Sequence, residues 1–218
     1  MSTIPVFIPV VNRIDLLRKA VDSVPRRATT APVVIDNTGG EFLDVSCEKV
    51  IPSVPLTASQ TLNLMQAIAI DRKVPFYFFM HNDTEAGPET VEKLYEMAMH
   101  KCSTDPKWGV IFTLYDTLAA YHTAAFDAVG PWDTNLPQYF TDNDMYRRLR
   151  LAGYELSESN LPVTHVGSQT IHSDPIRKLV NDITFPIYTR YYAAKWGGGP
   201  DRETFERPFN MNSPSFPL

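Results

Sequence analysis

Short apolar runs alternate with segments of helical periodicity along most of the 218-residue chain. The most apolar run spans residues 75–80; it is too short for a helix and rich in aromatic side chains, which predicts a central strand. Further strands are predicted at 6–11, 32–36, 49–51, 110–114, 118–121 and 163–166. This alternation is typical of an α/β fold in which helices cover both faces of a mostly parallel sheet.

The segments between the apolar runs have the spacing of amphipathic helices. Asn12 is expected to cap the first helix, Pro88 to occupy the first position of the third, and Pro186 to bend the last. The chain contains 18 prolines, which exclude a simple helical bundle, and most of them flank predicted strands or open predicted helices. The predicted helices span 14–24, 57–70, 88–98, 123–129, 142–152 and 175–196.

The composition is that of one globular domain over 1–218, with 44% hydrophobic and 21% charged residues and no internal repeat. The net charge of −5 disfavours broad binding to nucleic acids or anionic membranes. Cys47 and Cys102 do not make a disulfide framework, which favours a cytoplasmic location. No basic segment precedes an apolar stretch at the N-terminus, and no apolar run approaches ~20 residues, so we expect neither a signal peptide nor a membrane span.

Polar side chains directly follow the predicted strands, at the sheet edge where open α/β folds bind ligands. A carboxylate there can hold a ribose hydroxyl or, through a divalent cation, a diphosphate. Asp83 follows the most apolar run, which favours a functional role, whereas Asn12 and Asn37 taken alone are more typical of caps and turns. The polar residues at these strand ends are Asn12, Arg13, Asp36, Asn37, His81, Asn82 and Asp83.

Asp142 lies where the helix at 142–152 begins, so the helix dipole stabilises its charge. Asp144 and Arg148 are four residues apart and can pair across one turn. These features fit a catalytic carboxylate and a well-capped surface helix equally. His165 lies in a short apolar strand, where a lone histidine is more often a core residue than a ligand.

Six segments, in order over almost the whole chain, resemble the motifs of the family 2 glycosyltransferases, which have the GT-A fold. One D-x-D-like segment alone is a weak signal, but six in this order, each in its strand or helix context, are specific. They span 8–13, 34–38, 79–84, 126–133, 141–154 and 163–168, the last with the form H-x-G-S.

The resemblance implies that a nucleotide-sugar donor, first of all a UDP-sugar, lies against the ends of the first, second and central strands. It also implies that Asp83 and His165 bind Mn²⁺ or Mg²⁺ and that Asp142 is the catalytic base. The nucleotide-binding half would span 1–85, the acceptor and catalytic half 86–172, and a C-terminal helix with an irregular tail 173–218. The implied donor-binding residues are Pro9, Val11, Asn12, Arg13, Asp36, Asn63, His81, Asn82 and Asp83.

Two residues depart from the family pattern. His81 stands where D-x-D has its first acid, so Asp83 is the carboxylate ligand and a metal-binding role for His81 is open. Thr141 stands at the first acid of the family's E-D pair. Asp142 is therefore the only residue at the position of the base, with Asp144 as the fallback.

The implied reaction is metal-dependent, inverting transfer of a sugar to a hydroxyl acceptor: a polysaccharide, lipid, protein or, less favoured by the charge, a modified nucleobase. The changes at His81 and Thr141 also suit an inactive nucleotide-sugar-binding module. A nucleotidyltransferase is disfavoured because no glycine-rich phosphate loop follows the first strand. Four aromatic residues fit either an acceptor platform or a core: Tyr121, His122, Trp132 and Tyr139.

Overall fold

The computed structural model describes residues 3–40, 43–167 and 174–211, so Ser168 of the H-x-G-S segment and the tail 212–218 lie outside it. Its centre is a seven-stranded sheet. A second, two-stranded sheet pairs β5 (Thr84–Ala86) with β9 (Val163–His165). The strands of the large sheet are, in spatial order, β3 (Glu48–Val50), β2 (Thr30–Asp36), β1 (Ile4–Val10), β4 (Phe76–Met80), β7 (Tyr115–His122), β6 (Trp108–Thr113) and β8 (Glu155–Glu158).

The large sheet is mostly parallel, as predicted. β1 pairs in parallel with β2 and β4, β2 with β3, and β6 with β8. In this sheet β7 alone runs against its neighbours, β4 and β6. All five side chains of β4 are buried, none more than 8% exposed, which confirms the predicted central strand.

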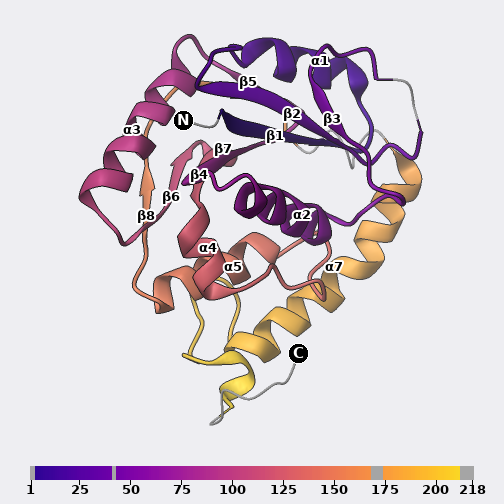
Figure 1. Cartoon of the computed structure of the whole chain (residues 1–218). Coiled ribbons are helices and arrows are strands. Elements are labelled where there is room, and N and C mark those ends of the chain that lie inside the picture. Colours follow the sequence, from indigo (N-terminus) through magenta and orange to yellow (C-terminus); the bar gives the residue numbers. More distant parts are fainter. Residues whose placement is uncertain (1–2, 41–42, 168–173, 212–218) are drawn as a thin grey trace.

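Helices cover both faces of the sheet, also as predicted (Figure 1). One face carries α1 (Ile14–Ser23) and α3 (Thr90–Thr104). The other carries α2 (Ala58–Asp71), α4 (Thr123–Val129) and α5 (Thr141–Leu151). The long helix α7 (Pro175–Trp196) runs along the outside of this second layer, and the 3-10 helix η1 (Pro208–Asn210) follows it.

Two of the strands carry no apolar run, and the sequence pattern did not predict them. β8 reads Glu-Leu-Ser-Glu and lies at the edge of the sheet, where pairing with β6 rather than burial holds it. β5 reads Thr-Glu-Ala and is held by its antiparallel partner β9. Backbone hydrogen bonds, rather than hydrophobic patterning, therefore define both strands.

Two helix starts also differ from the prediction. Arg13, with a left-handed φ of 58°, precedes α1, so Asn12 is not its cap. α3 begins only at Thr90, two residues beyond Pro88. Pro186 lies inside α7, and the helix continues through it to Trp196.

A buried network of charges joins α7 to the first turn of α5. The Lys195 ammonium lies 2.6 Å from the Asp144 carboxylate and 2.8 Å from that of Asp133. The Trp196 indole N–H donates to Asp144 at 2.8 Å, and the Arg148 guanidinium donates to its second oxygen at 3.0 Å, which confirms the predicted pair across one helical turn. Asp144 has no exposed surface, so these donors replace its hydration.

The first half of α7 lies outside the core. Ile176, Val180, Ile183 and Ile187 recur at helical spacing and are each more than half exposed. Phe185, on the opposite side of the helix, packs on the rings of Tyr139 and Phe140. Within the described parts of the chain, no helix combines the length and the apolar character that a membrane span requires.

The network predicts a large stability cost for Lys195→Met. The substitution leaves the carboxylates of Asp133 and Asp144 without their shared ammonium, which typically costs about 3–5 kcal/mol for a buried pair. Urea unfolding of the purified chain measures the change. The matched control is Lys178→Ala on the same helix, whose ion pair with Asp182 is more than half exposed and should leave the unfolding midpoint nearly unchanged. Equal unfolding midpoints for the two variants would contradict the stabilising role of Lys195.

Candidate active site

The ends of β1, β2 and β4 bring the predicted donor-binding residues to one edge of the sheet. Because these strands are parallel, their carboxyl ends lie side by side. The backbone N–H of Asn37 donates to the Val10 carbonyl at 2.8 Å, and the Asn82 amide donates to the Asn12 carbonyl at 3.0 Å. These bonds tie the segments after the three strands to one another.

The small sheet adds His165 to this edge from far along the chain. Thr84 of β5 pairs with His165 of β9, and the backbone N–H of Val166 donates to the Asp83 carbonyl at 3.1 Å. The register therefore places His165 beside Asp83. The lone histidine of a short apolar strand is thus half-buried at the candidate site rather than in the core.

His81, Asp83 and His165 form a compact cluster whose ligand atoms all lie within 4.8 Å of one another. Asp83 Oδ1 is 3.2 Å from His165 Nε2 and 3.9 Å from His81 Nδ1. Burial lowers the pKa of His81 well below its usual range, an effect that the nearby His165 reinforces and the Asp83 charge opposes. His81 is therefore a neutral imidazole near pH 7, with a nitrogen lone pair to donate.

The ligand atoms of this cluster suit a divalent cation. Imidazole nitrogen and carboxylate oxygen are both established ligands of divalent metals, and a neutral histidine is the form that binds them. The structure thus brings together Asp83 and His165, the two residues expected to bind metal, and adds His81 to them.

Asp142 lies in the first turn of α5, as expected, and the Tyr115 hydroxyl donates to its Oδ2 at 2.6 Å. Burial, together with the Asp142 charge, raises the pKa of Tyr115, so this phenol stays protonated and remains a donor. Tyr115 has a left-handed φ of 50° at the start of β7, a strained conformation that turns its ring towards α5.

Asp116 is an acidic residue of the site that the sequence reasoning missed. It is 9% exposed, and its Oδ1 lies 3.8 Å from His81 Nε2. Burial, and then the charge of Asp142, raise its pKa to about 7. Asp116 thus connects the His81 cluster electrostatically with Asp142. An acid between the apolar runs at 110–114 and 118–121 was the available signal.

Other expected donor-binding residues are engaged in local bonds. Asp36 Oδ1 accepts from the Thr38 N–H at 2.9 Å and from the Thr38 hydroxyl at 2.7 Å, which orients the carboxylate. The Arg13 guanidinium donates to both carboxylate oxygens of Asp15. Pro9 and Val11 lie at the end of β1 and just after it.

Asn63 and Asp144 are both engaged in contacts within the fold. The Asn63 amide bridges α2 to the backbone of Trp132, accepting from its N–H at 2.8 Å and donating to its carbonyl at 3.0 Å. A contact between Asn63 and the nucleotide-sugar donor therefore stays a prediction. Asp144, the fallback base, is fully buried against Lys195 and Arg148, so it cannot reach an acceptor.

Of the two alternatives left open for the four aromatic residues, an acceptor platform or a core, the structure supports the core for two of them. Tyr121 and Trp132 are at most 2% exposed and pack in the core, and Tyr139 packs on α7. His122 stacks on Trp108 with ring centroids 4.7 Å apart. Alternating apolar patterns do not distinguish a ring that lines a site from one that fills the core.

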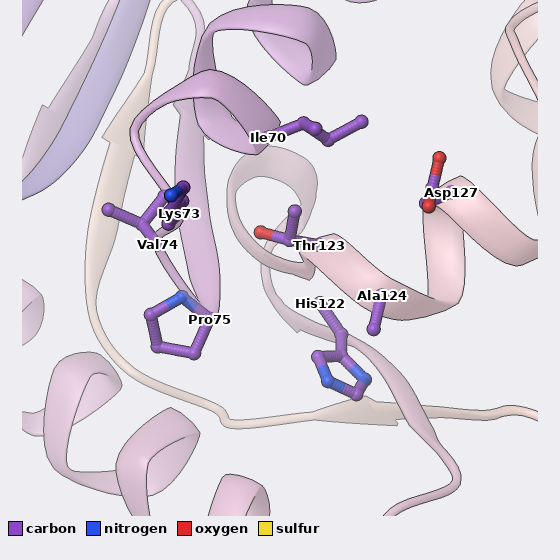
Figure 2. A pocket seen from close by; sticks show the side chains of 8 residues that line it. All are labelled: Ile70, Lys73, Val74, Pro75, His122, Thr123, Ala124 and Asp127. Carbon is purple, nitrogen blue, oxygen red and sulfur yellow. The ribbon is translucent and has the colours of Figure 1, made fainter.

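A pocket of about 400 Å³ lies at the opposite end of the sheet from this cluster (Figure 2). It opens around Pro75 and His122, at the start of β4 and the end of β7, with Lys73, Thr123 and Asp127 at its walls. The five residues of β4 separate it from His81 by roughly 17 Å at 3.3 Å per residue. The pocket is therefore distinct from the candidate site.

No known protein family and no curated protein matches this sequence. Solved structures do match in fold. Glucosyl-3-phosphoglycerate synthase from Mycobacterium tuberculosis, crystallised with Mg²⁺ and UDP, matches with a TM-score of 0.58 and 14% identity over 84% of this chain and 78% of that one. TarS 1-349 from S. aureus matches with a TM-score of 0.55 and 13% identity over 72% of this chain, which spans 58% of the TarS chain.

The chain has a GT-A-like fold.

A CMP-2-keto-3-deoxy-manno-octonic acid synthetase in complex with CTP also matches, with a TM-score of 0.50 and 12% identity over 83% of this chain and all of that one. The GT-A-like architecture is therefore common to glycosyltransferases and to a nucleotidyltransferase. At such low identity the matches establish the fold, and the site residues must support any function.

The cluster of His81, Asp83 and His165 predicts that Asp83→Asn lowers the affinity for Mn²⁺ by roughly tenfold or more, since the substitution removes the carboxylate that faces both imidazoles. Isothermal titration of the metal-free chain with Mn²⁺ measures the affinity. Glu85→Gln, two residues along and 43% exposed at its side chain, is the matched control and should bind as the unmodified chain does. Unchanged Mn²⁺ binding in Asp83→Asn would show that the cluster is not a metal site.

Proposed function

We propose that this chain is a metal-dependent, inverting glycosyltransferase that takes its sugar from a nucleotide-diphosphate donor. The favoured donor is a UDP-sugar. The supporting observation is the cluster of His81, Asp83 and His165 at the carboxyl ends of the central strands, electrostatically linked to Asp142. The structurally similar synthase was crystallised with Mn²⁺, UDP-glucose and phosphoglyceric acid in one complex and with Mg²⁺ and UDP in another.

In this proposal the strand ends hold the donor. Asp83 and His165, with His81, would hold a divalent cation, which as a Lewis acid would stabilise the charge that develops on the leaving diphosphate. Asp36 would receive the ribose or the base at the end of β2, with its carboxylate already oriented by Thr38.

Asp142 would take the proton of the acceptor hydroxyl. The Tyr115 hydroxyl holds Asp142 Oδ2, and Oδ1 would receive the proton as the acceptor oxygen attacks the anomeric carbon. A base on the opposite face of the sugar from the diphosphate leads to attack opposite the leaving group, and so to inversion. The neighbouring Asp116, whose pKa is raised to about 7, adds little competing charge when it is protonated.

The proposal predicts that Asp142→Asn slows nucleotide release by about 10²–10⁴-fold, the usual contribution of a general base. The measurement is UDP release from a panel of UDP-sugars with Mn²⁺, with polysaccharide, lipid, protein and small-molecule acceptors in separate reactions. UDP and Mn²⁺ affinities should not change, because Asp142 lies outside the donor-binding strand ends.

Asp127→Asn is the matched control, since Asp127 is an exposed acid of α4 at the far end of the sheet. Full activity of Asp142→Asn would refute the base assignment. Metal-dependent UDP binding without turnover on any acceptor would support an inactive binding module instead. Diphosphate release from CTP would support a nucleotidyltransferase.

The stereochemical course gives an independent test. Inversion predicts that an α-linked donor such as UDP-glucose yields a β-linked product, because the acceptor attacks from the face opposite the diphosphate. Proton NMR of the product reports the anomeric configuration through its coupling constant. A product with retained configuration would require a different mechanism and would remove Asp142 from its proposed role.

A further inference from the structure

His81 lies between two carboxylates from different strands. Its Nδ1 is 3.9 Å from Asp83 Oδ1, and its Nε2 is 3.8 Å from Asp116 Oδ1. The backbone N–H of His81 donates to the Thr117 carbonyl at 2.9 Å, which fixes this residue beside the start of β7. Each ring nitrogen therefore faces a different acid, so one nitrogen can bind a cation while the other stays turned towards a carboxyl group.

Asp116 has a fixed orientation of its own. Its Oδ2 accepts from the Tyr146 hydroxyl at 3.3 Å, and that hydroxyl lies 3.0 Å from the hydroxyl of Tyr121. Both tyrosines are buried, so the contact directs Oδ1 of Asp116 towards His81. Among the ion pairs found in the described ranges, the one that includes Asp116 is with His81. One oxygen of the buried carboxyl group thus accepts from Tyr146, and the other faces the His81 imidazole at 3.8 Å.

The ligand set is rich in nitrogen for a divalent cation site. Two imidazoles and one carboxylate converge, with ligand atoms within 4.8 Å of one another. Mg²⁺ prefers oxygen ligands and retains its water, whereas imidazole suits transition metals. Affinity at such sites generally rises from Mn²⁺ to Co²⁺.

We infer that His81, positioned by Asp116, makes this centre selective for transition-metal cations, so that Mn²⁺ and Co²⁺ bind in preference to Mg²⁺. The inference rests on the proposed function in placing a cation at this site and adds which cation the site takes. Histidine ligands commonly donate their second N–H to a carboxylate, which sets the tautomer and the ring orientation. The 3.8 Å between His81 Nε2 and Asp116 Oδ1 exceeds a hydrogen bond, so in this structure Asp116 faces the ring through electrostatic attraction rather than through a hydrogen bond.

Electron paramagnetic resonance of Mn²⁺ tests the selectivity without donor or turnover. The full chain, freed of metal, is titrated with Mn²⁺, which is then displaced with Mg²⁺. His81→Asp should lower the excess of Mg²⁺ needed for displacement at least tenfold, because a second carboxylate replaces an imidazole. Spin-echo modulation should detect two imidazole nitrogens on Mn²⁺ in the unmodified chain and one in His81→Asp.

Asp116→Asn should weaken Mn²⁺ binding about 10- to 100-fold and broaden the nitrogen modulation from His81. His100→Asp, an exposed histidine on α3, is the matched control and should change neither quantity. Circular dichroism verifies folding, and His81→Asn replaces His81→Asp if that variant does not fold.

An unchanged ratio of Mn²⁺ to Mg²⁺ affinity in folded His81 variants would overturn the selectivity. Unchanged affinity and modulation in Asp116→Asn would overturn the positioning role. Absence of glycosyl transfer on every donor and acceptor would refute the proposed function and leave these metal measurements unaffected, so the two failures are distinguishable.

Discussion

The arrangement of the site depends on the burial of β4 between a parallel and an antiparallel neighbour. Its five side chains anchor the strand in the core, and its carboxyl end places the half-buried His81 and the buried Asp83 at the edge of the sheet. Parallel pairing with β1 adds the segment after Val10 to the same edge. Antiparallel pairing with β7 brings the start of that strand there instead of its end, and with it Asp116. One hydrophobic strand thus determines which polar residues meet.

The beginning of α5 shows how two acids in one helical turn acquire opposite roles. Asp144 faces inward, where Lys195, Arg148 and the Trp196 indole neutralise and bond it. Asp142 faces the site, where the bond from Tyr115 leaves it in contact with solvent. Since both carboxylates lie in the first turn, the buried network that secures α7 also fixes the direction in which Asp142 points. The cost of burying Asp144 is offset by these hydrogen-bond donors, and the helical turn that carries Asp142 is held rigidly as a result.

Most of the sheet and part of the site could be predicted from the sequence, and the exceptions have physical reasons. Buried strands such as β4 leave an apolar run, whereas β5 and β8 are held by backbone pairing and leave none. Asp83 lies just after a strand, and Asp142 lies at the beginning of a helix. Asp116 was not predicted because site residues are expected at the carboxyl ends of strands, which holds for parallel neighbours and is reversed for the antiparallel β7. For Tyr121 and Trp132, both now seen in the core, the sequence left two positions open because an aromatic residue has the same appearance whether it lines a site or fills a core.

The histidine at position 81 puts an imidazole where D-x-D has its first acid, and the carboxyl group that faces its Nε2, Asp116, has a pKa raised to about 7 by burial and by the charge of Asp142. A carboxylate at this position would face the cation directly. Here a neutral imidazole takes that place, and a carboxylate, Asp116, stands behind it at 3.8 Å. A cation that polarises the imidazole would strengthen the N–H of its far nitrogen as a donor, and the buried Asp116 would gain from that bond what it lacks from water. In the proposed centre, Asp116 of the neighbouring strand β7 would take part of the role of the acid that His81 replaces, and this is the reason to propose an active enzyme rather than an inactive module.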